Sequence, residues 1–145
     1  MHGAVFLLLG LLTCHFLPSF ALGFAAISIK GNAIRAEIAS SRAEQMLGLG
    51  NRDALGKGSG MLFFYETAGE KIIWMKRMRF AIDIIWILRG TVVHIEKNVP
   101  PPSPMMSSSR LQTYGHGIVA DMVLEVAKGF ADRTGLALGD PVRFQ

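Results

Sequence analysis

The sequence predicts a mainly β fold: a compact β sandwich or barrel-like domain with one or two short helices. Half of the 145 residues are hydrophobic and 18% are charged, which is enough apolar surface for one core. The apolar residues alternate or form short runs, as they do in strands. Glycine- and proline-rich segments separate these runs at short intervals. With no internal repeat and no change of composition, we expect a single β-rich domain over residues 25–145.

Two hairpins give the clearest strand predictions. Residues 25–30 and 33–39 carry apolar side chains at near-alternate positions, with Gly31-Asn32 between them. Arg89-Gly90 separates two runs rich in isoleucine, valine and tryptophan and is the strongest hairpin signal in the chain. These two runs are residues 82–88 and 91–96, and further strands are expected at residues 61–65, 72–75, 122–126 and 141–144.

Short helices and loops are expected between the strands. Ser41 and Glu44 have the spacing of a capping box, and Gly48 should end the helix that follows after about two turns. A second short helix is predicted within residues 128–135. The proline-rich run at residues 99–104 should end a sheet segment, because proline removes backbone donors.

The first 21 residues have the features of a signal peptide. Residues 4–12 are apolar, and Ser19 and Ala21 form a small-x-small cleavage pattern. We therefore expect an exported protein, periplasmic or extracellular, with an uncleaved membrane anchor as the alternative. If this segment stays uncleaved, membrane contact is expected only through it. Cleavage would remove Cys14, the one cysteine.

Composition and motifs exclude several kinds of site. The formal net charge of +4 is too small to indicate a nucleic-acid partner. The methionines, His94 and His116 are not spaced as a copper site, so neither a metal nor a cofactor is expected. Ser107 to Ser109 lack a nucleophile-elbow context, and the glycine-rich residues 56–60 lack the spacing of a phosphate-binding loop.

One short segment combines the residue types of a binding site. An aromatic ring, three cations and a carboxylate lie within ten residues, and an aromatic platform beside cations can hold a sugar or another small ligand. The alternative for the tryptophan is ordinary core packing. The candidate binding residues are Trp74, Lys76, Arg77, Arg79 and Asp83.

Asp83 stands among isoleucines and needs a physical explanation. An unpaired carboxylate is costly to bury, so Asp83 should either lie on a solvated face or have a partner. The simplest expectation is a structural ion pair with Lys76, Arg77 or Arg79. The alternative is a catalytic or ligand-binding carboxylate, for which Glu66, Glu70, Glu96 and Glu125 are available as a second acid.

A series of short motifs, in this order and spacing, resembles domain-of-unknown-function family 192 over about residues 33–142. The motifs are residues 43–49 with Arg52, 60–63, 73–76, 82–87, 92–95, 98–100, 124–126, 128–129 and 139–140. The resemblance implies a mostly β sandwich or barrel-like domain, often exported or membrane-anchored in bacteria, with no established reaction. Ala81 stands where the family often has proline.

These observations favour a binding function over catalysis. The first hypothesis is an exported, non-enzymatic domain that binds a small ligand, an envelope polymer or a protein partner around Trp74 to Asp83. The second is an enzyme acting on envelope carbohydrate with Asp83 as acid or base, assisted by Lys76 or Arg79. The third is a structural or assembly module, which should expose an apolar patch. No catalytic residue is assigned.

Overall fold

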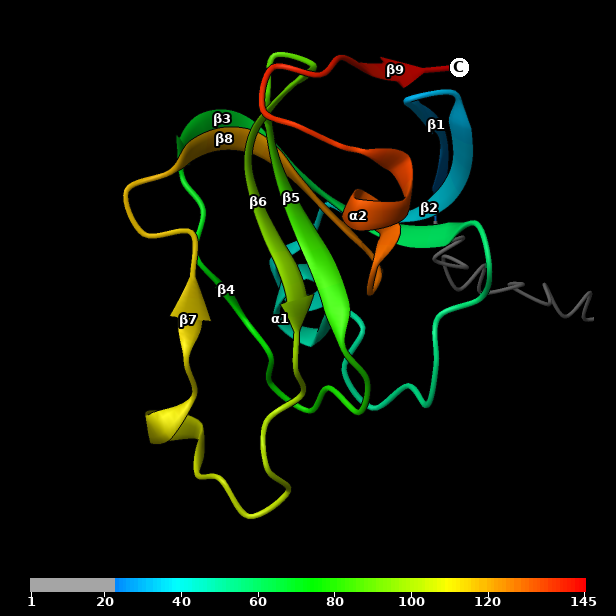
Figure 1. Cartoon of the computed structure of the whole chain (residues 1–145). Coiled ribbons are helices and arrows are strands. Elements are labelled where there is room, and N and C mark those ends of the chain that lie inside the picture. Colours follow the sequence, from blue (N-terminus) through cyan, green and yellow to red (C-terminus); the bar gives the residue numbers. More distant parts are fainter. Residues whose placement is uncertain (1–22) are drawn as a thin grey trace, which may run out of the picture.

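A computed structural model describes residues 23–145 (Figure 1). The predicted leader, residues 1–21, and Cys14 lie outside the described residues. Over residues 23–145 the elements are β1 (Phe24–Ile29), β2 (Asn32–Ala39), α1 (Arg42–Leu47), β3 (Ser59–Glu70), β4 (Ile73–Trp74), β5 (Ile82–Leu88), β6 (Thr91–Val99), a 3-10 turn (Ser108–Arg110), β7 (Thr113–Tyr114), β8 (Val119–Ala127), α2 (Phe130–Thr134) and β9 (Val142–Phe144). No helix in this part of the chain is long and apolar enough to cross a membrane.

A seven-stranded sheet curls into a half-barrel, in the order β6-β5-β8-β3-β2-β1-β9 (Figure 1). The β2–β3 pair is parallel and the other neighbouring pairs are antiparallel. The two edges meet at one end, where Thr91 bridges to Pro141. There the amide of Val92 donates to the carbonyl of Asp140 at 3.0 Å. The mainly β, barrel-like fold expected from the sequence is confirmed.

Apolar side chains fill both faces of this sheet. The inner face carries residues such as Ile27, Ile85 and Leu124, together with Ala131 of α2. The outer face carries Phe63, Ile84 and Trp86, and the segments after α1 and β4 cover it. Side chains alternate between the two faces along each strand, and both faces are covered, which explains why the interior strand β5, between β6 and β8, is buried over six consecutive residues.

Helix α1 begins as its capping box predicts. The Ser41 hydroxyl accepts from the amide of Glu44 at 3.2 Å, and the Glu44 carboxylate accepts from the amide of Ser41 at 2.8 Å. Gln45 fixes the helix to the sheet, because its side-chain amide donates to the carbonyl of Phe64 at 2.8 Å. This short helix is therefore held against the middle of β3.

Two local predictions need correction. The first hairpin turns at Lys30-Gly31, one residue before the expected Gly31-Asn32, and Asn32 already pairs with Ile29. Strand β3 continues to Glu70, although residues 67–70 were expected to form a turn. Its pairing with β8 shifts register between Phe64 and Gly69 and then resumes, so the irregularity lies inside a continuing strand.

Candidate functional site

A cleft of about 460 Å³ opens on the outer face of the half-barrel. Its walls are α1 with the residues just after it, the end of β3, and the segment through β4. The lining combines three kinds of side chain. They are the cations Arg42, Lys71 and Lys76, the aromatic residues Phe63, Tyr65 and Trp74, and the carboxyl groups of Glu70 and Glu125.

Glu125 lies at the buried floor of this cleft. It is 4% exposed, and its Oε2 has no hydrogen-bond partner among residues 23–145. In β8 it stands opposite Met61 of β3 and Ile84 of β5. Residues paired across a sheet share a face, so the side chain of Glu125 projects from the same face as Ile84. It is a carboxyl group in apolar surroundings that the fold leaves unpartnered.

Burial decides the ionisation of Glu125. Loss of solvation raises its pKa to about 8, and the charge of Arg52 opposes this increase only in part. Arg52 is itself engaged, because its two terminal nitrogens donate to the two carboxylate oxygens of Glu37 at 2.6 and 2.7 Å. At neutral pH Glu125 is therefore mostly uncharged and carries a proton that it can donate.

Tyr65 stays neutral in the same surroundings. Burial, followed by the charge of Glu125, raises the pKa of its phenol to about 12. The cleft thus places two uncharged groups inside and keeps its charges toward solvent: Arg42 and Glu70 are exposed, and Lys71 and Lys76 are half-buried.

Two of the rim cations lie against aromatic rings. The ammonium nitrogen of Lys76 is 4.8 Å from the centre of the Trp74 ring, and that of Lys71 is 4.3 Å from the centre of the Tyr65 ring. Lys71, Lys76 and Arg42 form no ion pair with any residue in the described range. Their charge is consequently available to a ligand.

The structure brings together only part of the predicted site. Trp74 and Lys76 line the cleft, whereas Arg77 and Arg79 line a second groove beside the proline-rich run, to which Lys76 also contributes. Arg79 is paired with Asp53 at 2.6 Å, and both side chains are exposed. The backbone of Arg77 has φ of 60°, so the chain turns sharply between Lys76 and Arg79. Arg77 and Arg79 therefore lie outside the cleft, and Lys76 lies where the two surfaces adjoin.

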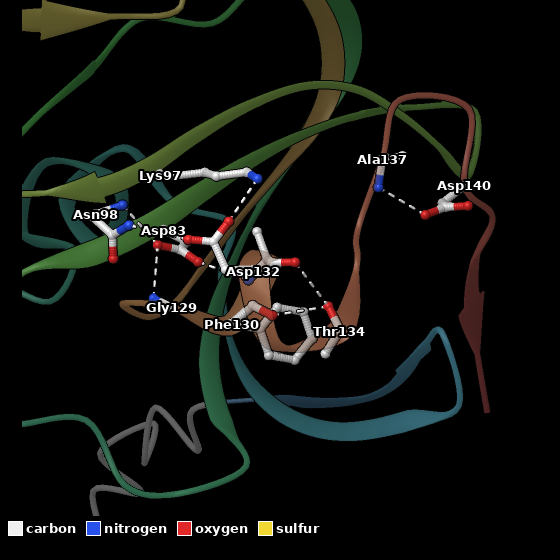
Figure 2. A network of polar contacts seen from close by, with 10 residues as sticks. Asp83, Lys97, Asn98, Gly129, Phe130, Asp132, Thr134, Ala137 and Asp140 are labelled. Carbon is white, nitrogen blue, oxygen red and sulfur yellow. Dashed lines mark hydrogen bonds and ion pairs between the residues drawn. The ribbon is translucent and has the colours of Figure 1, made fainter.

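Asp83 does not line the cleft. It lies in a network of polar contacts that joins neighbouring segments of the fold (Figure 2). It is fully buried, and its two oxygens accept from the backbone amides of Asn98 (2.8 Å), Gly129 (3.1 Å) and Ala131 (2.8 Å). The expected ion pair with Lys76, Arg77 or Arg79 is therefore wrong over the described chain, because backbone donors satisfy this carboxylate instead. Asp83 ties the start of α2 to the end of β6.

The two strand carboxylates are on opposite faces. Asp83 is paired with Val126, whereas Glu125 is paired with Ile84, one residue along each strand. The signal that singled out Asp83, an acidic residue between apolar neighbours, is equally present in Leu124-Glu125-Val126. Sequence reasoning treated Glu125 only as one of several possible second acids. The same argument, applied to every strand, would have identified it.

His94 and His116 do not assemble a metal centre. The Nε2 of His94 lies 3.0 Å from a carboxylate oxygen of Glu96, and the Nε2 of His116 lies 2.7 Å from the hydroxyl of Thr113. Within residues 23–145 no group of three or more histidine, cysteine or acidic side chains is placed to hold a metal ion.

Comparisons with known proteins place the chain in a family without adding a reaction. No curated protein matches it. A crystal structure of a protein of unknown function from Novosphingobium aromaticivorans is 27% identical, with a TM-score of 0.72 over 88% of this chain and 89% of that one. A crystal structure from Sinorhizobium meliloti, described as a "putative transcription regulator", is 22% identical, with a TM-score of 0.73 over 85% of this chain and 95% of that one, and supports the fold alone. The family model DUF192, described as "Uncharacterized ACR, COG1430", matches residues 25–144, and the chain belongs to this family.

Proposed function

We propose that this chain is an exported, non-enzymatic binding protein whose outer-face cleft holds a small ligand. The observation that carries the proposal is the unpartnered carboxyl of Glu125 at the floor of the cleft. A buried polar group without a hydrogen bond costs about 1–3 kcal/mol. A ligand that accepts from this carboxyl would recover that cost, since the fold itself supplies no partner among the residues described.

The size and lining of the cleft agree with a small ligand. Its volume of about 460 Å³ lies in the range of sites that enclose small organic molecules. Aromatic and aliphatic walls with a few polar groups are the usual composition of such sites. An envelope polymer or a protein would need a longer groove or a flatter surface than this cleft provides.

Binding accounts for the cleft better than catalysis does. Asp83, the acid or base of the enzyme hypothesis, is occupied by three backbone amides and does not line the cleft. The Oε2 of Glu125 has no hydrogen bond to a neighbouring side chain in the described range, so no second group is arranged with it for proton transfer.

A ligand screen by thermal unfolding tests the proposal. The full chain is mixed with a broad set of small metabolite-like compounds, and binders raise Tm. The increase should disappear in Glu125→Met and Trp74→Ala, with folding checked by circular dichroism. Glu66→Gln is the matched control, because it removes an exposed carboxylate outside the cleft and should keep the increase. An increase that survives both cleft substitutions contradicts the proposal, as does a screen without any binder.

Export is proposed on the leader sequence. The apolar run at residues 4–12 and the small residues Ser19 and Ala21 support cleavage after Ala21. Expression in a bacterial host with a periplasm should give a mature chain that begins at Leu22, identified by intact mass in the periplasmic fraction. A full-length chain that stays in the cytoplasm contradicts export, and a full-length chain in the membrane fraction supports the anchor instead.

A further inference from the structure

We infer that the ligand is a small organic anion with an apolar body and a neutral hydrogen-bond acceptor, such as a ketone oxygen, at its inner end. The inference rests on the proposed function and specifies the ligand of the same cleft. The inference follows from the kind of side chain that lines the cleft at each depth. Cations lie at the rim, apolar walls lie between, and a single buried carboxyl lies at the floor.

The rim selects for negative charge. Arg42, Lys71 and Lys76 line the cleft with no ion pair in the described chain, and the acidic residues of the lining are Glu70 and the buried Glu125. Glu70 is moreover engaged, because its Oε1 accepts from the amide of Gly117 at 2.6 Å. An entering anion would therefore meet an excess of positive charge, while an amine would be repelled.

The walls select for an apolar body. Phe63 is buried on one side, and Met46 and Leu47 of α1 leave about half of their surfaces exposed on the other. Large apolar side chains at this exposure gain free energy when a ligand covers them. The flexible methionine side chain also adapts its shape to the ligand, so the walls restrict the polarity of the ligand more strictly than its shape.

The floor selects for an acceptor. A neutral carboxyl donates one hydrogen bond, and the apolar neighbours of Glu125 in β3 and β5, Met61 and Ile84, offer it no side-chain acceptor. A ketone or ether oxygen fits this donor without adding a second charge to a buried site. A carboxylate placed there would have to lose its own solvation, which makes the rim its favoured position.

Four related probes separate these requirements. They are 6-oxoheptanoate with both groups, heptanoate without the inner acceptor, 2-heptanone without the charge, and heptylamine with the opposite charge. Binding to the full chain is measured at pH 7 by isothermal titration calorimetry. We expect 6-oxoheptanoate to bind about 3- to 10-fold more tightly than either heptanoate or 2-heptanone, the effect of one hydrogen bond or one exposed charge contact. Heptylamine should bind most weakly.

Substitutions assign each requirement to a residue. Lys71→Gln and Lys76→Gln should weaken the binding of 6-oxoheptanoate and of heptanoate and leave the binding of 2-heptanone unchanged. Added salt should likewise weaken the binding of the two carboxylates. Lys57→Gln is the matched control on an exposed loop outside the cleft. Glu125→Met should abolish the advantage of 6-oxoheptanoate over heptanoate.

A pH series adds a readout specific to the floor. The charged and titratable groups around Glu125 are Arg42 of α1, Arg52 of the following loop, Tyr65 of β3, and Glu70, Lys71 and Lys76. Binding of 6-oxoheptanoate should weaken above pH 8 as Glu125 loses its proton, and it should stay level in Glu125→Gln, which keeps a donor without titrating.

The outcomes distinguish the inference from the proposed function. Equal or tighter binding of heptylamine or 2-heptanone, or no binding of 6-oxoheptanoate at millimolar concentration, overturns the inferred ligand class. If the broad screen nevertheless finds a binder that depends on Glu125 and Trp74, the cleft remains a binding site for another class. If neither the four probes nor the screen gives a binder, both conclusions are wrong.

Discussion

Two carboxyl groups in neighbouring strands show how strongly local partners decide the role of an acidic residue. Asp83 is fully buried and accepts three backbone hydrogen bonds, whereas Glu125 is buried at the floor of the cleft and its Oε2 has no partner within the described chain. The hydrogen bonds of Asp83 stabilise the fold, whereas burial without a partner raises the pKa of Glu125 and favours its protonated form. Removing each group should therefore change stability in opposite directions.

Glu125→Gln should stabilise the protein at high pH. The pKa of Glu125 is about 8 in the folded state, whereas the unfolded chain releases this proton near the ordinary glutamate pKa of 4.5. The contribution of Glu125 is thus present below pH 4.5 and is lost as pH rises from 4.5 through 8. At pH 9 the variant should be more stable than the parent by about 2–4 kcal/mol, measured by urea unfolding. The same difference at pH 4 as at pH 9 would contradict this.

Asp83→Asn should destabilise the protein at every pH between 6 and 9. The asparagine amide keeps one acceptor oxygen but turns donors toward amides that need an acceptor, at the start of α2. We expect a loss of about 2–4 kcal/mol in urea unfolding. An unchanged midpoint would show that these contacts are dispensable. The exposed Asp53→Asn, which breaks only a surface pair, should cost less than about 1 kcal/mol.

Helix α1 and the loop before β8 are the elements that define the cleft and its support. The capping box starts α1 at Arg42, and α1 supplies one wall of the cleft. Ser41→Ala should cost about 1 kcal/mol and weaken ligand binding, because it loosens that wall. Urea unfolding measures the first effect and calorimetry the second. Ser109→Ala, an exposed serine outside the cleft, should change neither.

Gly115 is required where the loop crosses the sheet. It has φ of +88°, and a Cβ there would lie 2.5 Å from the carbonyl oxygen of Lys71 and 2.7 Å from the ring of Trp86. The same carbonyl accepts from the indole nitrogen of Trp86 at 2.7 Å. Gly115→Ala should therefore lower stability by more than 1 kcal/mol and shift Trp86 fluorescence, whereas Gly117→Ala, with open space around it, should leave that fluorescence unchanged. A larger change of Trp86 fluorescence in Gly117→Ala than in Gly115→Ala would contradict this packing.

The sequence allowed the local elements to be predicted better than their pairing. Strand positions, the Arg89-Gly90 turn and the capping box follow from neighbouring residues, and the structure contains them. The strand expected at residues 72–75 is shorter in the structure, where Ile73 and Trp74 form β4. The two-residue strand β7 was not predicted, because it depends on its pairing with β4. The extension of β3 to Glu70 also depends on a partner, because Gly69 and Glu70 pair with Ala120 and Val119.

At the scale of the whole molecule, the curled sheet separates an inner core from the outer face that carries the candidate cleft. The inner face is closed where the β6 edge meets the segment before β9. Sequence reasoning could not place the candidate site on the outer face, since that depends on how the sheet curls and which strands adjoin. It found Trp74 and Lys76 through their own chemistry and did not single out Glu125, although Leu124-Glu125-Val126 carries the same signal as Asp83.

Closure of the half-barrel should protect amides at its edges. The amide of Val92 donates to Asp140, and that of Val142 donates to Gly90 at 2.8 Å. Hydrogen exchange followed by NMR should show both amides protected to nearly the level of the interior strand β5, although they lie at the ends of the strand order. Rapid exchange at Val92 and Val142 would show an open edge.

The carboxyl titration of Glu125 tests the central claim most directly. The chain is labelled with ¹³C in the glutamate side chain, and the carboxyl shift is followed by NMR from pH 4 to 10 with and without 6-oxoheptanoate. The account predicts a midpoint near 8 in the free protein and a higher midpoint with ligand, because the ligand accepts a hydrogen bond from the protonated form. A midpoint near 4.5, unmoved by the ligand, would contradict a protonated donor at the floor of a binding cleft.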